Sequence, residues 1–253
     1  DYILQYKPSR GSNKNATIYL TPELKEASLG AGVLRFQAPV LFNDPNQETS
    51  DISRSYIFEN KDALGLDDSF GFPVVRKLDE GNSKKIADAY DAITNQPNNP
   101  EVKQAYERFS EEVLMQHQAV IDRGYKVEVF KGEGEPYANS KEMIEDLSNN
   151  KHMYILNTEA DFGETPITEQ QRQESPMLRK TDFVDVNGEP LLVNDLFRFV
   201  HDFFGHSELG NGFGPIGEEN AWMVHSRMFS PEARRAMTTE TRGQNSWVNF
   251  NKS

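Results

Sequence analysis

Residues 191–206 of the chain read LLVNDLFRFVHDFFGH, and this stretch decides how the C-terminal part folds. After Asn194, a residue type that often precedes the first turn of a helix, leucine, valine and phenylalanine recur at helical spacing. We therefore expect a helix that Asn194 caps and that continues through Phe204. The apolar run 191–193 follows an Asn-Gly pair, and 183–186 is a largely apolar run before it. An Asn-Gly pair between two such runs predicts a β-hairpin.

The middle of the chain alternates helical and strand patterns. Apolar residues at helical spacing predict helices over 83–94 and 100–123. Asn139 and Glu142 form a capping-box pattern, which predicts a helix that opens there and runs to about residue 147. Apolar residues also predict strands at 125–129 and 152–156.

Residues 1–80 carry a different pattern, rich in turn-forming residues, with short apolar runs at 17–20 and 33–36. The polar stretch 42–55 predicts a loop. The expected fold class is therefore α+β, with a strand-rich and loop-rich N-terminal region over 1–80 and a mainly helical part over 81–253 that carries the site. The two regions are also compatible with one continuous domain.

The composition narrows the class of protein. The 253 residues include no cysteine, which excludes disulfides, iron–sulfur clusters and cysteine-bound metals, so any metal must be bound by His, Asp or Glu. A formal net charge of −13 repels phosphate backbones and anionic membranes, so we expect neither nucleic acid nor a membrane as partner. No run approaches the roughly 18 apolar residues of a membrane-spanning helix.

Three of the five histidines lie between His201 and His225. On an ideal helix Asp202 and His206 are four residues apart and share a face. His201 and His206 are five apart and point about 140° away from each other. These two imidazoles converge only if the helix ends or unwinds near Gly205.

A glycine-rich connection over 210–217 leads to a second helix. It follows a helix and not a strand, so it does not fit a phosphate-binding loop. Glu218 and His225 are seven residues apart, two turns along one face, whereas Glu219 points about 100° away. Glu218 is therefore preferred over Glu219 as the carboxylate ligand.

These residues predict a metal site whose ligands are His201, His206, Glu218 and His225. Asp202 and Glu219 are the candidate catalytic residues, acting as a general base or as hydrogen-bonding partners of the ligands. His117 lies in an apolar stripe and His152 begins a strand, so we expect structural roles for both.

Two neutral imidazoles and one carboxylate on one side of an ion form the facial triad of non-haem iron(II) enzymes, which leaves positions open for dioxygen and substrate. The same ligands suit catalytic zinc with an activated water. Fe(II) is the expected cofactor and zinc the alternative. Three functions stay open: an oxygenase-like enzyme acting on a small molecule or a side chain, a zinc-type hydrolase, and a non-catalytic protein whose histidines are structural.

The segment HDFFGH at 201–206 resembles the His-Glu-x-x-Gly-His iron motif of the pterin-dependent aromatic amino acid hydroxylases. This resemblance implies that His201 and His206 bind iron and that the activity is hydroxylation. Asp202 replaces the glutamate of that motif, and Glu218 and Glu219 follow sooner than the third ligand of that family.

A longer segment, from about residue 126 to the C-terminus, resembles a family of proteins encoded by phage and prophage genomes. The resemblance is carried by YANS at 137–140, HDFFGH, EENAW at 218–222 and ETRGQNSW at 240–247. It implies phage provenance without implying a chemistry. We therefore expect the cytoplasm, that of the host if the protein is phage-encoded, or alternatively the virion, where the third function would be that of a particle or host-interaction protein.

The C-terminal stretch 240–250 interleaves polar residues with Trp247, Val248 and Phe250. Aromatic residues at this density are unusual in a disordered tail. We expect the segment to pack back on the domain, where its polar groups could line the pocket.

Overall fold

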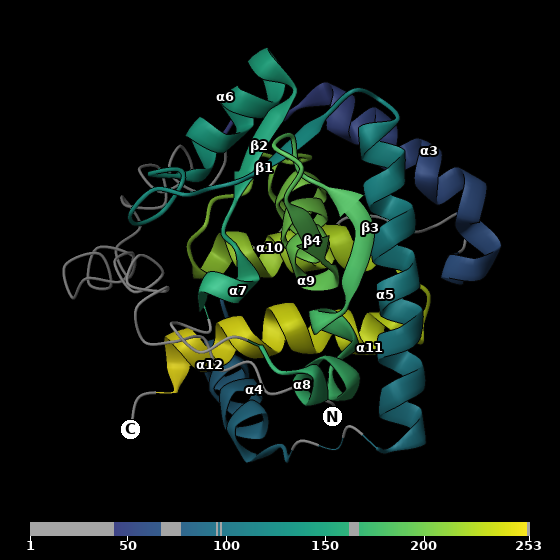
Figure 1. Ribbon diagram of the computed structural model, residues 1–253. Helices are drawn as coiled ribbons and strands as arrows, with labels where there is room; N and C mark the ends of the chain where they lie inside the picture. The colour runs from purple at the N-terminus through teal and green to yellow at the C-terminus, as the bar shows by residue number, and fades with distance from the viewer. Residues whose placement is uncertain (1–42, 67–76, 95, 97, 162–166, 252–253) are drawn as a thin grey trace.

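The computed structural model describes residues 43–66, 77–94, 96, 98–161 and 167–251, which are mainly helical (Figure 1). Two two-stranded sheets accompany the helices. The expected α+β class therefore holds only in its coarse form, with helices dominating. The apolar runs at 17–20 and 33–36, for which short strands were the expectation, lie outside the described residues.

The described part of the N-terminal region is mainly helical, and the expectation of a loop over 42–55 is wrong from Gln47 onwards. Helix α3 (Gln47–Leu64) begins after Asn46, whose side chain accepts a hydrogen bond from the Thr49 amide. Ile52, Tyr56 and Leu64 are buried along it. Apart from Phe58, the residues that the helix exposes are mostly polar, which is why its sequence has the composition of a loop.

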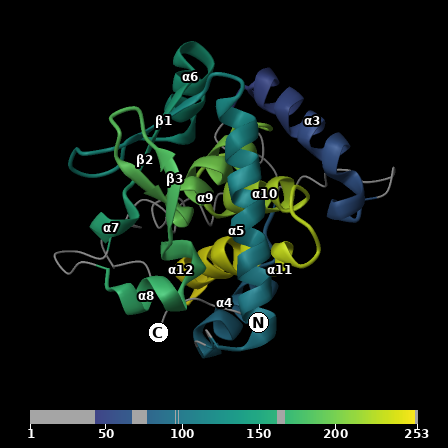
Figure 2. The ribbon, with the colours of Figure 1, turned by 45° about the vertical axis from the view of Figure 1, so that its right-hand side comes forward.

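Two further helices precede the first sheet, close to the expected ranges. Helix α4 covers Glu80–Ala92 and is capped by Asp79. Helix α5 covers Pro100–Ile121, with the Asn99 side chain accepting from the Glu101 amide at its start. Figure 2 shows α3 lying beside α5, which runs the height of the molecule.

The first sheet is a parallel pair, β1 (Lys126–Val129) with β2 (His152–Ile155). Helix α6 (Ser140–Asn150) makes the crossover between them. As the capping-box pattern predicts, the Asn139 side chain accepts from the Glu142 amide at the start of α6. Short helices α7 (Thr158–Asp161) and α8 (Glu169–Glu174) and the 3-10 turn η1 (Pro176–Leu178) then lead to the second sheet.

The expected hairpin is present as β3 (Lys180–Val184) paired antiparallel with β4 (Pro190–Leu192). Gly188 occupies its turn with a φ of 83°, a conformation that glycine adopts without strain. The turn is tied to the first sheet, because the Val129 amide donates to the Asp185 carboxylate at 3.0 Å. The hairpin thus leads directly into the helix that begins at Val193.

Helix α9 (Val193–His201) continues directly into η2 (Asp202–His206), a π-helical turn. The helix begins at Val193, two residues earlier than a helix capped by Asn194 would, and Leu192 occupies the cap position. The Asp195 carboxylate instead accepts from the Leu192 amide at 2.8 Å. It also accepts from the amide and hydroxyl of Thr158, at 2.9 Å and 2.5 Å, and so joins α9 to α7.

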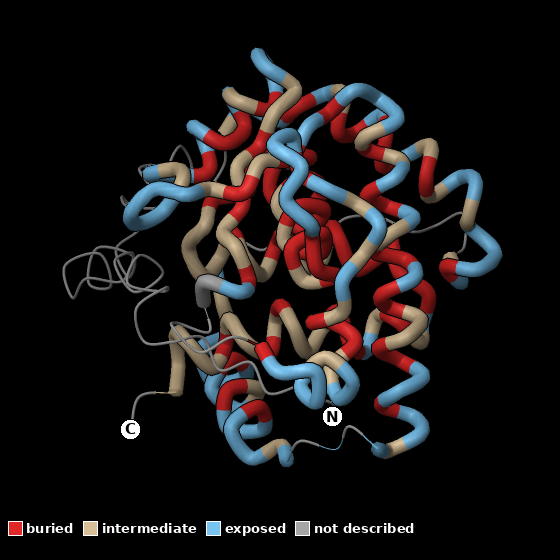
Figure 3. The backbone as a smooth tube through the Cα atoms, viewed as in Figure 1, coloured by how far each residue is buried: buried red, intermediate tan, exposed pale blue. Residues whose placement is uncertain are grey.

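The core lies where α9, η2 and α5 meet helix α10 (Pro215–Ser226), and Figure 3 shows the buried residues concentrated there. The rings of Phe109 and Phe197 meet edge to face at 4.8 Å between centroids. The fully buried aromatic residues come from all parts of this junction: Tyr106, Phe109, Phe199, Phe203, Phe204 and Phe229. None of the helices in the described ranges combines the length and apolar character needed to cross a membrane.

The C-terminal segment packs against the rest of the chain, as its aromatic residues predict. It forms α11 (Ala233–Thr238), a second π-helical turn η3 (Thr239–Gly243) and α12 (Gln244–Phe250). The indole of Trp247 donates to Asp91 of α4 at 2.9 Å and its ring lies 6.2 Å from that of Tyr90. Helix α12 thus lies between α4 and α10.

The loop after η2 is clamped to the start of α3. The Asn43 amide donates to the Gly210 carbonyl at 2.6 Å, and the Asn46 amide donates to the Ser207 carbonyl at 2.9 Å. Gly210 has a φ of 73°, and a Cβ there would lie 2.0 Å from the Asn43 carbonyl oxygen. Only glycine therefore allows this approach.

Gly210→Ala should lower the free energy of unfolding by about 3 kcal/mol or more, since it adds a backbone clash to the cost of a left-handed alanine. Gly188→Ala is the matched control, because its φ is 83° and nothing lies within 4 Å of an added Cβ. The control should lose only about 1–2 kcal/mol. Urea unfolding of both variants measures the difference, and equal losses would contradict the clamp.

Candidate metal centre

The π-helical turn η2 is the local feature that brings His201 and His206 together. A π turn closes i to i+5 hydrogen bonds and takes in about one residue more than the 3.6 of an α-helical turn. The Ser207 amide accordingly donates to the Asp202 carbonyl at 3.3 Å. The five-residue spacing therefore places the two rings side by side, with centroids 5.4 Å apart. The expected break near Gly205 is instead a widened continuous helix.

Gly205 allows α10 to approach this turn. A Cβ at that position would lie 3.1 Å from both the side chain and the carbonyl of Ala221, and 3.3 Å from Cε1 of His201. These distances are tighter than side chains normally tolerate. The close approach puts the first turn of α10, which carries Glu218, opposite the two histidines.

Atoms of His201, His206 and Glu218 lie within 4.8 Å of one another, so this group could hold a metal ion. The Nε2 atom of His201 is 3.8 Å from Oε2 of Glu218, and the Nε2 atom of His206 is 3.6 Å from Oε1. Two metal–ligand bonds of roughly 2.1 Å meeting at about 90–110° separate their donor atoms by about 3.0–3.4 Å. The two distances to Glu218 would thus have to shorten by a few tenths of an ångström for the carboxylate and each imidazole to share an ion.

The histidine nitrogens that face Glu218 are available for a metal. Nε2 of His201 is buried and has no hydrogen-bond partner among the described residues. The opposite nitrogen of His206, Nδ1, lies 3.3 Å from the carbonyl oxygen of Asn211. A carbonyl only accepts, so Nδ1 of His206 carries a proton and Nε2 is the atom left to bind either a second proton or a metal.

The electrostatics of the group favour a cation. Burial raises the pKa of Glu218, but His206 and His201 outweigh it and bring the pKa to about 2, so the carboxylate is charged at neutral pH. Burial lowers the pKa of His206, but the carboxylates of Glu218 and Asp202 outweigh it and the pKa is raised. The raised pKa means that Nε2 of His206 binds a second proton readily. A divalent ion bound between these groups would take the place of that proton.

Glu218 is also held from the C-terminal segment. The amide nitrogen of Asn245 in α12 donates to Oε2 of Glu218 at 2.9 Å. A carboxylate ligand that is hydrogen-bonded in this way has a fixed orientation. The sequence alone suggested no more than that polar groups of this segment could line the pocket.

Glu219 lies away from the group, as the helical geometry predicts. Its two carboxylate oxygens pair with Nε and Nη2 of Arg242, at 3.0 Å and 2.6 Å. The Arg242 guanidinium in turn lies 4.3 Å over the ring of Trp222. Glu219 therefore joins α10 to η3 instead of facing the two histidines.

Asp202 lies at the edge of the group. Its Oδ1 atom is 3.9 Å from Nε2 of His206, and its side chain is 33% exposed, against 17% for Glu218 and 1% for His206. Burial raises the pKa of Asp202. The carboxylate is thus the acidic group of the cluster with the most access to solvent.

His225 lies behind His201 and outside the candidate ligand group. The Nδ1 atoms of the two rings are 3.2 Å apart, and Nε2 of His225 is 2.7 Å from Oε1 of Gln116 in α5. Burial holds the pKa of His225 well below its usual value, so the ring is neutral. Sequence reasoning missed Gln116, whose one signal is a polar side chain within the apolar stripe of α5.

The other two histidines take no part in this centre. His117 is buried between the rings of Phe183 and Phe199. His152 lies between Asp146 and Glu128, with Nδ1 2.8 Å from Asp146 and Nε2 3.3 Å from Glu128.

Searches against protein-family models, curated proteins and solved structures return no match to this chain. The chemistry of the centre is therefore the basis for assigning a function.

Metal affinity should fall as the pH decreases through the raised pKa of His206. The ion must displace a proton there, so the loss should begin above pH 6.5, the value of an unperturbed histidine, and reach about tenfold per pH unit for each proton displaced. Anaerobic Fe²⁺ titrations between about pH 8 and about pH 6 measure this dependence. A constant affinity over that range would contradict coordination by the histidines.

Proposed function

We propose that this protein is a mononuclear non-haem iron enzyme, oxygenase-like, acting on a small molecule or a side chain. His201, His206 and Glu218 would bind Fe(II) on one side and leave the other side open to dioxygen and substrate. Two imidazoles and one carboxylate with open positions are the ligand set of non-haem iron(II) oxygenases. The cofactor and the substrate class are parts of this proposal.

The observation that carries the proposal is the convergence of three ligand atoms on one point. A buried imidazole nitrogen without a partner is costly unless something binds it. Nε2 of His201 is such an atom, and it faces the ionised carboxylate of Glu218. A divalent cation would satisfy the nitrogen and the carboxylate together.

Each neighbouring residue would have a defined task. Asn245 would hold the Glu218 carboxylate in place through its hydrogen bond. Asp202, the acidic residue with the most access to solvent, would accept or donate a proton beside the open side of the centre. Iron, when bound, would supply the activation of dioxygen that side chains cannot provide.

A zinc-type hydrolase is the second candidate, and the position of Asp202 favours it. A zinc ion on the same ligands would lower the pKa of a bound water, and a carboxylate next to His206 could take up the proton. Both candidates need the same three ligands. They differ in the metal retained and in redox activity.

The test is metal analysis of protein purified without chelators, followed by anaerobic Fe²⁺ titration of His201→Ala, His206→Ala and Glu218→Gln. Each variant should lose more than about 100-fold in affinity, since loss of an outer partner alone typically costs about 10–100-fold. Glu219→Gln is the matched control on the same helix. It should keep wild-type affinity, because Glu219 pairs with Arg242.

The outcomes separate the candidate functions. Iron at one equivalent with substrate-dependent oxygen consumption supports the oxygenase, whereas tightly bound zinc without redox activity supports the hydrolase. Wild-type protein that binds neither metal would overturn both. The remaining function would then be a non-catalytic one, such as a phage particle or host-interaction protein.

A further inference from the structure

A chain of buried polar groups leads away from His201, on the side opposite to Glu218. Nδ1 of His201 is 3.2 Å from Nδ1 of His225, and Nε2 of His225 is 2.7 Å from Oε1 of Gln116. The Gln116 amide nitrogen then donates to the carbonyl of Met228 at 2.9 Å. Gln116 and His225 are fully buried, and His201 is 8% exposed.

The Met228 carbonyl sets the direction of every hydrogen bond in this chain. A backbone carbonyl only accepts, so it must face the amide nitrogen of Gln116 and not its oxygen. The Gln116 oxygen therefore faces His225 and also accepts. It follows that Nε2 of His225 carries the proton and that its Nδ1 has a lone pair.

The same logic fixes His201. Because Nδ1 of His225 accepts, Nδ1 of His201 must donate, and a neutral ring protonated there has its lone pair on Nε2. That atom is the one that faces Glu218. The opposite tautomer would require the Gln116 oxygen to face the Met228 carbonyl, which would leave two buried acceptors in contact.

We propose that Gln116 and His225 are positioning residues that hold His201 in the metal-binding tautomer and ring orientation. This inference rests on the proposed metal centre. Histidine ligands commonly donate their second nitrogen to a carboxylate, a carbonyl or water. Here Nδ1 of His225 is the acceptor, and Gln116 of α5 keeps the proton of His225 on Nε2.

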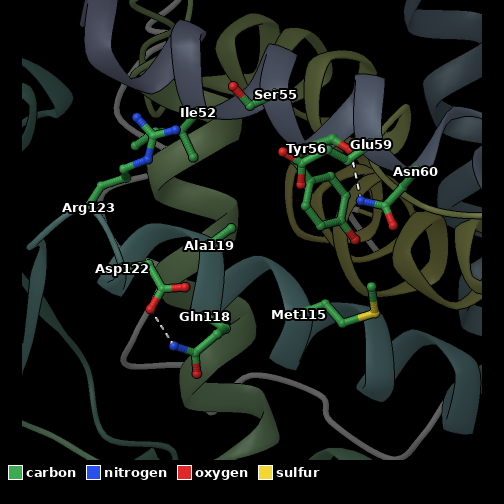
Figure 4. Close-up of a pocket in the computed structure, with 10 residues that line it drawn as sticks. All are labelled: Ile52, Ser55, Tyr56, Glu59, Asn60, Met115, Gln118, Ala119, Asp122 and Arg123. Atoms are coloured by element: carbon green, nitrogen blue, oxygen red, sulfur yellow. Dashed lines mark hydrogen bonds between the residues drawn. The ribbon is translucent and has the colours of Figure 1, made fainter.

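The chain of groups extends towards the surface through Tyr56 of α3. The Gln116 side chain acts on the Tyr56 hydroxyl, whose pKa it lowers against the larger opposite effect of burial. The Tyr56 ring lines the groove between α3 and α5 together with Ile52, Ala119 and Met115 (Figure 4). Tyr56 is only 5% exposed. It therefore closes this route to bulk water, which would otherwise compete for the Gln116 amide.

The tautomers can be measured without any metal. Long-range ¹H–¹⁵N correlation spectra of the ¹⁵N-labelled, metal-free protein should show His201 protonated at Nδ1 and His225 protonated at Nε2. His201 protonated at Nε2, or His225 at Nδ1, would overturn the proposal. This measurement stands whether or not the protein proves to be an iron enzyme.

Variants of Gln116 test the consequence for the metal. Gln116→Met removes both hydrogen bonds at similar volume and should weaken anaerobic Fe²⁺ binding by about 10–100-fold. His117→Leu is the matched control, since His117 is also a buried polar residue of α5, but its ring packs against Phe183 and Phe199 and makes no hydrogen bond to the described residues. The His117→Leu variant should keep the wild-type Fe²⁺ affinity. Equal affinities for the two variants would overturn the proposal.

Two substitutions at His225 separate positioning from packing. His225→Asn keeps an acceptor near the place of Nδ1 and should retain most of the wild-type Fe²⁺ affinity. His225→Gln carries its polar end near the place of Nε2 and should lose as much affinity as Gln116→Met. Equal loss in both would assign a merely structural role to His225. Wild-type protein that binds neither Fe²⁺ nor Zn²⁺ would instead refute the metal centre and leave the tautomer measurement standing.

Discussion

The π-helical turn at Asp202–His206 is the constraint on which the rest of the centre depends. In an α-helix the imidazoles of His201 and His206 would diverge by about 140°. The wider turn puts them side by side, and Gly205 within it leaves room for α10 to deliver Glu218. A π turn gives up regular helical hydrogen bonds, and such turns occur often at functional sites. Phe203 and Phe204 of this turn are fully buried, and their packing offsets the loss of regular hydrogen bonds.

Burial of charge is the second feature that shapes this part of the molecule. Ionised side chains are costly to desolvate unless each has a partner. Glu219 has Arg242, and Glu208 after η2 forms a buried ion pair with Arg227 after α10. Glu218 is different, because its neighbours are two imidazoles and the Asn245 amide. Of these three carboxylates Glu218 is thus the one without an arginine partner, and a cation bound to it and the two imidazoles would balance its charge.

The supporting groups come from every part of the described chain. The candidate ligands are on α9, η2 and α10, but Gln116 is on α5, Asn245 is on α12 and the clamp on the η2 loop comes from residues 43–46. The contacts from Gln116 and from residues 43–46 join positions more than a hundred residues apart, whereas Asn245 and Glu218 are 27 residues apart. The centre is therefore a product of the whole fold and not of the HDFFGH segment alone.

The sequence by itself determined the helices over 83–94 and 100–123, the strands at 125–129 and 152–156, and the hairpin, because each has a local signal: a cap or a proline, a run of apolar residues, or an Asn-Gly turn. It did not determine that the two strands pair in parallel. It also determined the geometric relation between Glu218 and Glu219, which follows from the helical repeat. It was wrong for α3, whose narrow apolar stripe is hidden among polar residues, and for the helix start at Asn194. Tertiary structure alone decided the π turn, the place of His225 behind His201 and the role of Gln116. These depend on the Met228 carbonyl, on Ala221 and on α5, none of which is near the motif in sequence, so no local pattern could reveal them.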